Sequence, residues 1–221
     1  MKKNKLSASI MCADLMNMKS QINQLEKSGI DFLHIDLIDN SFAPNLTFGP
    51  DFVKQLRMIT DMPFEFHYMV KSPQSIIESL LDDEIKNTHI IHLGINESVT
   101  EISSIVKMKG DSFGVALLPV ETVGIVKEYL GFIDEVLLLS VIPGFAGSTF
   151  IESSYERARS LVKLIGERNI DFCVDGAMSV ERCVKMSEIG ANIFVGGTSC
   201  IFNTENSIIE NVRILRNSLI N

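Results

Sequence analysis

The stretch Phe32–Asn40, FLHIDLIDN, is typical of one β-strand followed by a turn. Side chains alternate between the two faces of a strand, so His34 and Asp36 share one face, together with Phe32. The other face carries only apolar residues, Leu33, Ile35 and Leu37. A buried imidazole and carboxylate are unfavourable unless partners satisfy them. Two interpretations follow: a divalent metal ion bound by both groups, or a hydrogen-bonded His and Asp in a loop mouth.

The composition is that of a globular protein. The chain has 221 residues, 46% of them apolar and 22% charged, which is enough for one sizeable core, and we expect a single domain over residues 1–221. The net charge of −8, without a run of Lys and Arg, argues against a nucleic-acid partner. No stretch approaches 18 apolar residues, so we expect no membrane span.

The four cysteines have no CxxC spacing and lie in apolar segments. We expect Cys12, Cys173, Cys183 and Cys200 to be reduced, buried thiols, as in a cytoplasmic protein.

Strand and helix patterns alternate about eight times along the chain. A doubly wound open sheet would give the same alternation with fewer units, so this length favours a (β/α)₈ TIM barrel of the phosphate-binding type. The expected strands are Leu6–Met11, Phe32–Leu37, Phe64–Met69, His89–Leu93, Phe113–Leu118, Val136–Val141, Phe172–Asp175 and Ile193–Gly196. We expect helices between them, including one between the fifth and sixth strands.

Local signals predict several helix ends. Gly29 is expected to end the first helix at its C′ position, and Pro50 to open the second. Ser72-Pro73 predicts an N-cap followed by Pro at the first helical position. Ser153 with Glu156 has the spacing of a capping box.

Polar side chains gather at predicted strand ends, which is where such barrels place their chemistry. The residues are Ser9, His34, Asp36, His67 and Asp175. Each alone is more simply a satisfied polar residue, but in a barrel the two His and two Asp converge. Such a set suits one divalent ion, Zn²⁺, Fe²⁺, Mn²⁺ or Co²⁺. His92 has no obvious partner, and we leave it outside the ligand set.

Three glycine-containing loops follow the last three strands. They are Gly144-Phe145-Ala146-Gly147, Gly176-Ala177 after Asp175, and Gly197-Thr198-Ser199, which we expect to open a short helix. Backbone N–H groups in such loops hold an anion, and glycine lets the ligand approach closely. Loops after strands seven and eight bind phosphate in many barrels. Together the two clusters predict a phosphorylated substrate whose other end lies on a metal ion.

With these residues in view, the chain resembles the ribulose-phosphate 3-epimerase family. The matching segments are LSASIM (6–11), HIDLIDNSFAPNLTFGP (34–50), FHYMV (66–70), SVIPGFAGSTFI (140–151), VDGA (174–177) and VGGTSCIF (195–202). The similarity covers essentially the whole chain. The segments at 144–147 and 197–199 look like the branch that acts on D-allulose 6-phosphate, whereas the loop at 39–50 is closer to the general pattern.

The resemblance implies roles for the clustered residues. His34, Asp36, His67 and Asp175 would bind the metal, and Asp36 and Asp175 would also be the acid/base pair on opposite faces of the substrate. Ser9, His67 and Met69 would contact the sugar, Met69 as part of a thioether cap. The reaction would invert C3 of a ketose phosphate, D-ribulose 5-phosphate or D-allulose 6-phosphate, through a cis-enediolate. The resemblance also suggests a homo-oligomer.

The chain departs from the family pattern at several auxiliary positions. These are Ile38, Asn40, Ser41, Leu93, Gly94, Leu118, Leu139, Ile142 and Ala177. A catalytically weak or inactive sugar-phosphate-binding regulatory protein is therefore an alternative. Another phosphate-binding barrel enzyme would more often carry a catalytic Lys at a strand end, and no Lys lies at such a position here.

Overall fold

The computed structural model describes residues 2–81 and 84–219. Its strands are β1 Lys5–Ser9, β2 Phe32–Ile38, β3 Phe64–Met69, β4 Thr88–His92, β5 Ser112–Leu117, β6 Glu135–Leu139, β7 Asp171–Asp175 and β8 Ile193–Gly196. Its α-helices are α1 Met18–Ser28, α2 Pro50–Arg57, α3 Gln74–Leu80, α4 Val99–Met108, α5 Ser154–Ile165, α6 Val180–Ile189 and α7 Ile208–Ser218. Three 3₁₀ helices are η1 Ile10–Cys12, η2 Leu15–Asn17 and η3 Val123–Glu128.

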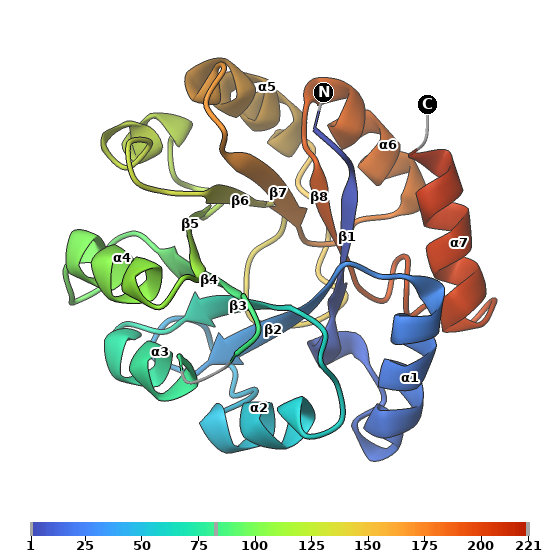
Figure 1. Ribbon diagram of the computed structural model, residues 1–221. Coiled ribbons are helices and arrows are strands. Elements are labelled where there is room, and N and C mark those ends of the chain that lie inside the picture. The colour runs from blue at the N-terminus through green and yellow to red at the C-terminus, as the bar shows by residue number, and fades with distance from the viewer. Residues whose placement is uncertain (1, 82–83, 220–221) are drawn as a thin grey trace.

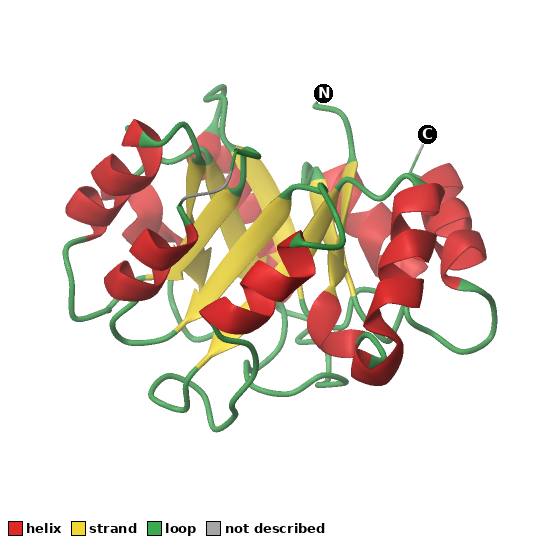
Figure 2. Cartoon of the chain, turned by 60° about the horizontal axis from the view of Figure 1, so that its bottom comes forward, coloured by secondary structure: helices red, strands yellow, loops and turns green. Residues whose placement is uncertain are grey.

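Within the described residues, eight parallel strands pair in chain order and β8 pairs with β1, so the sheet closes into a barrel. The helices form a ring around the strands, with α1 packed beside α7 (Figure 1). Figure 2 shows the strands tilted across the barrel, with long loops projecting below the strand ends. The predicted (β/α)₈ barrel is confirmed. No helix of the described chain is long and apolar enough to cross a membrane.

Strand alternation divides the apolar residues into two cores. Leu33, Ile35 and Leu37 of β2 face outward into the core between strands and helices, as predicted. A smaller core fills the barrel interior, where Phe32 packs at its edge. Its buried members are Ile90, Ala116, Leu137, Leu139, Cys173, Ile193 and Val195. These lie on β4–β8, whereas most interior side chains of β1–β3 are polar, with Phe32 and Met69 as exceptions.

The register of β2 against β3 sets which polar side chains meet. Asp36 lies opposite His67, and His34 lies opposite Glu65. Paired residues of adjacent strands point to the same side of a sheet, so these four side chains share the barrel interior. On the other side of the barrel, Asp175 is the last residue of β7.

Some helix ends agree with the local signals and others do not. Gly29 adopts the left-handed conformation that ends α1, and Pro50 is the first residue of α2. The segment between β5 and β6 forms the 3₁₀ helix η3 instead of a longer helix. The first strand is shorter than expected, because the chain turns into η1 at Ile10.

Two capping predictions are wrong. Pro73, not Ser72, is the N-cap of α3. Without a side-chain cap, the backbone N–H of Gln74 donates to Glu97 Oε2 at 2.8 Å. The capping box at α5 does not form: Ser153 makes no cap hydrogen bond, because its own backbone is already helical. Glu156 instead pairs with Arg159 at 2.5 Å.

Candidate active site

Four predicted ligand side chains meet at the carboxyl end of the barrel. His34 and Asp36 come from β2, His67 from β3 and Asp175 from β7. One ligand atom from each lies within 4.8 Å of the others. Both imidazoles are fully buried, and Asp36 is 4% exposed. The four side chains can therefore hold one ion, which is the arrangement that the sequence predicted.

The distances between these atoms suit a small divalent ion. Asp36 Oδ1 lies 3.3 Å from His34 Nε2 and 3.3 Å from His67 Nδ1. Asp175 Oδ2 lies 3.8 Å from each of the same two nitrogens. Bonds of about 2.1 Å to a shared ion would make angles of about 104° for the shorter separation and about 130° for the longer. These angles bracket the tetrahedral value, so the donor set fits a divalent ion.

The orientation of His34 also fits a metal ligand. Its Nδ1 lies 2.6 Å from Glu65 Oε2, while its buried Nε2 has no hydrogen-bond partner among the described residues. An unpartnered buried nitrogen is costly unless something binds it. A cation between the two aspartates and the two imidazoles would bind it directly.

His67 is oriented by His92, and the sequence-based view of His92 as unpartnered is wrong. The two Nε2 atoms are 2.9 Å apart, so one of them donates to the other. Burial, together with the charges of His67 and Lys71, lowers the pKa of His92 well below its ordinary value. His92 is therefore neutral and can accept from His67 Nε2–H, which leaves His67 Nδ1 facing the aspartates.

The two aspartates have different electrostatic surroundings. Burial raises the pKa of Asp36, but the imidazoles of His34 and His67 outweigh burial and lower the pKa below its usual range. Burial also raises the pKa of Asp175, and there the net shift stays upward, since the charge of Asp36 adds to it. Two carboxyl groups whose pKa values are pushed apart are typical of an acid/base pair.

One cavity joins this cluster to the glycine loops. It is lined by Asp36 and Asp175 and by all the residues predicted to bind substrate except His67. Those residues are Ser9, Met69, Gly144–Gly147, Gly176–Ala177 and Gly197–Ser199. Ser9 Oγ donates to Asp36 Oδ2 at 3.0 Å. The structure thus brings the two predicted metal-binding aspartates and the predicted phosphate residues into a single cavity.

Sequence reasoning missed several side chains of this cavity. Met11 and Met178 line it beside Met69. Met11 ends the first predicted strand, but a methionine there gave no chemical signal, and Met178 lies outside the predicted strands. Cys12 also lines it, although we expected a fully buried thiol; all four cysteines are free, and Cys12 is half-buried.

The loop backbone is suited to an anion, although Gly197–Phe202 forms a turn and not the short helix that we expected. Within the described chain, the backbone N–H groups of Gly176, Ala177, Gly197 and Ser199 donate to no protein acceptor. Ala177 has a positive φ of 50°, which is unusual for a residue with a side chain. Free N–H groups on neighbouring loops are what a phosphate group needs.

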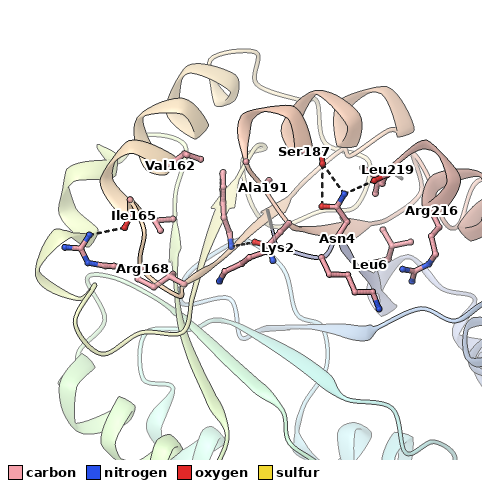
Figure 3. A pocket seen from close by; sticks show the side chains of 16 residues that line it. Lys2, Asn4, Leu6, Val162, Ile165, Arg168, Ser187, Ala191, Arg216 and Leu219 are labelled. Atoms are coloured by element: carbon pink, nitrogen blue, oxygen red, sulfur yellow. Dashed lines mark hydrogen bonds between the residues drawn. The ribbon is translucent and has the colours of Figure 1, made fainter. Parts of the chain in front are cut away.

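A second cavity, of about 590 Å³, lies at the opposite end of the barrel, beside α5, α6 and α7 (Figure 3). Three of the four cationic side chains that line it are already bound by the protein. Lys2 pairs with Asp171, Arg168 donates to the carbonyl of Ile165, and Arg216 pairs with Asp31. Since strand beginnings in such barrels serve stability, we assign no catalysis to this end.

The closed barrel and the cluster at its carboxyl end define a protein of the (β/α)₈-barrel class, whose candidate site combines two carboxyl groups with two imidazoles that could hold a metal ion. The model of the ribulose-phosphate 3 epimerase family matches residues 5–202, and the chain belongs to this family. It is therefore a carbohydrate epimerase, an isomerase.

Relatives support the same assignment. The ribulose-phosphate 3-epimerase of Chlamydia pneumoniae is 34% identical over 213 residues, covering 94% of this chain and 91% of that protein. The ribulose-phosphate 3-epimerase of Bacillus subtilis is 30% identical over 198 residues, covering 88% and 91%. Among solved structures, 3-hexulose-6-phosphate synthase from Salmonella typhimurium has a TM-score of 0.70 at 12% identity and covers 98% of both chains, which shows a shared fold.

Proposed function

We propose that this epimerase inverts C3 of D-ribulose 5-phosphate, giving D-xylulose 5-phosphate, and that it requires one divalent metal ion. The observation that carries the proposal is the position of Asp36 and Asp175 in one cavity with the glycine loops. Two carboxylates and an anion site are the groups that proton transfer on a sugar phosphate needs. The names of the relatives support this substrate as the first choice.

The ligand set for the ion is His34, Asp36, His67 and Asp175, whose donor atoms fit a small divalent cation. When bound, the ion would act as a Lewis acid and stabilise negative charge that develops on the oxygens at C2 and C3. The imidazoles are kept available for it by Glu65 and His92, which occupy their other nitrogens.

The aspartates would carry out the proton transfers. One carboxylate removes the proton from C3. The electron pair of that C–H bond forms the C2=C3 double bond while the π pair of the C2=O bond moves onto the C2 oxygen, which gives the cis-enediolate, and the same pairs return when C3 is protonated again. The other carboxyl group then delivers a proton to C3 from the opposite face, which inverts the centre. The two side chains come from β2 and β7, so they approach the substrate from different sides of the barrel mouth. Ser9 donates to Asp36 Oδ2 and would hold that carboxylate in place.

The phosphate group would lie against the loops after β6, β7 and β8. Gly176 has a φ of 108°, and a Cβ atom there would lie 2.6 Å from Val141 Cγ2. The backbone therefore runs too close to its neighbour for any side chain, which leaves its N–H open to a ligand. Ser140 Oγ holds this loop through the carbonyls of Asp175 and Gly176, at 2.7 and 2.6 Å.

The test is proton NMR in D₂O of the zinc-loaded protein with D-ribulose 5-phosphate and, separately, with D-allulose 6-phosphate. We expect the C3 proton signal of D-ribulose 5-phosphate to disappear while the epimer appears. Exchange with D-allulose 6-phosphate alone would replace the proposed substrate by that one. If neither exchanges in a sample that holds one metal per chain, the chain is a sugar-phosphate-binding protein and the proposal is wrong.

The variants Asp36→Asn and Asp175→Asn test the two-carboxylate scheme. Each should lower the rate of C3 exchange by at least about 10²-fold, because an amide cannot accept the proton. Each should still bind inorganic phosphate, since the glycine loops are unchanged. The control is Asp51→Asn, in the first turn of α2, which should exchange at the wild-type rate. Normal exchange in either site variant would contradict the scheme.

A further inference from the structure

We propose that Glu65 is a positioning residue, which holds His34 in the tautomer that presents Nε2 to the metal site. The inference rests on the proposed metal function. It adds to the site a buried acidic residue that does not touch the substrate cavity.

Glu65 is placed to orient His34. It lies opposite His34 in the β2–β3 register and is 1% exposed. Its Oε2 is 2.6 Å from His34 Nδ1 and accepts a second hydrogen bond from Ser7 Oγ at 2.8 Å. An ionised carboxylate can only accept, so the hydrogen of His34 must sit on Nδ1. The lone pair of Nε2 then faces Asp36 and Asp175.

Glu135 lies close to Glu65 in the barrel interior but makes no hydrogen bond to His34. One oxygen of Glu135 lies within 4.8 Å of an oxygen of Glu65, and Glu135 Oε1 has no hydrogen-bond partner among the described residues. Glu135 is therefore the matched comparison for Glu65. Gly114 provides the room for its side chain, since a Cβ atom there would lie 3.2 Å from Glu135 Cβ.

The chemistry of these side chains argues against a second metal site around Glu65. Glu65, Glu135 and Cys173 do offer ligand atoms within 4.8 Å of one another. An ion there would require two carboxylates and a thiolate without protons, in a place where all three side chains are buried. Glu65 Oε2 is already satisfied by Ser7 Oγ and His34 Nδ1, without an ion.

The first experiment measures zinc affinity by competition with a chromophoric chelator, in the full-length wild type, Glu65→Gln and Glu135→Gln. Loss of the carboxylate behind a metal-binding imidazole lowers metal affinity by about 10- to 100-fold, so we expect that loss for Glu65→Gln. Glu135→Gln is the matched control. It changes a neighbouring buried carboxyl group that makes no hydrogen bond to His34, so its affinity should stay close to that of the wild type.

The second measurement reads the tautomer of His34 directly. The chain has four histidines, so two-bond ¹H–¹⁵N correlation spectra can resolve every ring. In the metal-free wild type we expect His34 to carry its proton on Nδ1, with Nε2 unprotonated, and a proton on Nε2 would overturn the inference. In metal-free Glu65→Gln we expect this preference to be lost. A merely structural role of Glu65 would change stability and leave the tautomer signal of the variant as it is in the wild type.

The outcomes separate this inference from the proposed function. If the wild type binds no zinc, the proposed metal function is wrong, and this inference falls with it. If the wild type binds one zinc and Glu65→Gln binds it equally well, only the role of Glu65 is overturned. Two zinc ions per chain, one of them lost in Glu135→Gln, would make Glu65 and Glu135 ligands and overturn the inference too.

Discussion

At the scale of single residues, the orientation of the two imidazoles depends on buried atoms that lie outside the cavity. Each imidazole of the proposed metal site has two nitrogens, and a buried partner occupies the one that faces away: Glu65 for His34 and His92 for His67. One partner is a carboxyl group and the other a neutral ring, although both imidazoles face the same aspartates.

Position 176 requires glycine for two separate reasons. Its φ is positive, and a Cβ atom there would clash with Val141. We expect Gly176→Ala to lower the free energy of unfolding by about 1 to 3 kcal/mol, as overpacking does, and to weaken phosphate binding. Urea unfolding and phosphate titration measure the two effects. Gly147→Ala is the control, because Gly147 has a φ of 79° and no atom within 4 Å of its added Cβ. Equal losses of unfolding free energy in the two variants would mean that the clash with Val141 has no effect on stability.

The sequence predicted which residues face the cavity better than it predicted their partners. Alternation along β2 and β3 is a local property, so His34, Asp36 and His67 could be assigned to one face. The partners Glu65 and His92 obey the same alternation, but a hydrogen bond between strands depends on register and strand tilt. Neither is encoded within one strand, and for that reason His92 was left out of the site.

At the scale of secondary-structure elements, α5 is tied to the ends of two strands through Arg157. Its guanidinium donates to the carbonyls of Leu118, Leu139 and Glu121, at 2.6, 3.2 and 3.2 Å. We expect Arg157→Met to lower the free energy of unfolding by about 2 to 3 kcal/mol, because charged hydrogen bonds to part-buried carbonyls are lost.

The control for Arg157→Met is Arg159→Met on the same helix, measured by the same urea unfolding. Arg159 pairs with exposed Glu156, so its loss should change the free energy of unfolding by less than about 0.5 kcal/mol. Similar values for the two variants would show that the carbonyl contacts contribute little.

Asp171 at the start of β7 predicts a pH dependence of stability. It accepts from Lys2, Lys5 and Asn192 at 2.7, 2.8 and 3.1 Å. Burial raises its pKa, but these donors outweigh burial and lower the pKa below its ordinary 3.8. A lowered folded-state pKa adds stability above the unfolded pKa, and that stability is lost as pH falls through the folded value.

Unfolding of the wild type and Asp171→Asn across this pH range measures the effect. The wild type should be the more stable of the two near neutral pH, and the difference should shrink below pH 3.8. If the difference in stability stays constant on acidification, it comes from packing and not from the charge of Asp171.

Helix starts were the least predictable elements, and α3 shows the physical reason. Ser72-Pro73 is a good local signal, yet the N–H of Gln74 is satisfied by Glu97 from the loop before α4. A partner that comes from a distant segment leaves no trace in the local sequence. The Pro50 and Gly29 signals were confirmed because they act through their own backbone conformation.

At the scale of the whole molecule, the alternation of strands and helices was enough to predict the barrel. Eight strand–helix units leave few alternative folds for a chain of 221 residues. Which side chains meet in the barrel interior depends on how the sheet closes, and the strand pattern alone does not give that. The expectations of a single domain, a homo-oligomer and a cytoplasmic location stay predictions.

A metal ion that binds only the folded barrel should stabilise the whole molecule. At a free zinc concentration of 100 times Kd, binding adds about 2.7 kcal/mol. For a chain of this size, that amounts to a rise in Tm of about 5 to 10 °C. Thermal unfolding with and without zinc measures it, and Asp36→Asn should show a smaller rise. Identical Tm values for the zinc-loaded and metal-free wild type would contradict the proposed site.

The placement of Asp36 on β2 and Asp175 on β7 has a consequence for biosynthesis. A nascent chain whose first half has left the ribosome already carries both imidazoles and one aspartate, but the second carboxylate is still to be translated. The proposed proton relay therefore cannot exist before the seventh strand docks. Activity would switch on at the end of synthesis, and any truncated product that lacks this strand would be inert.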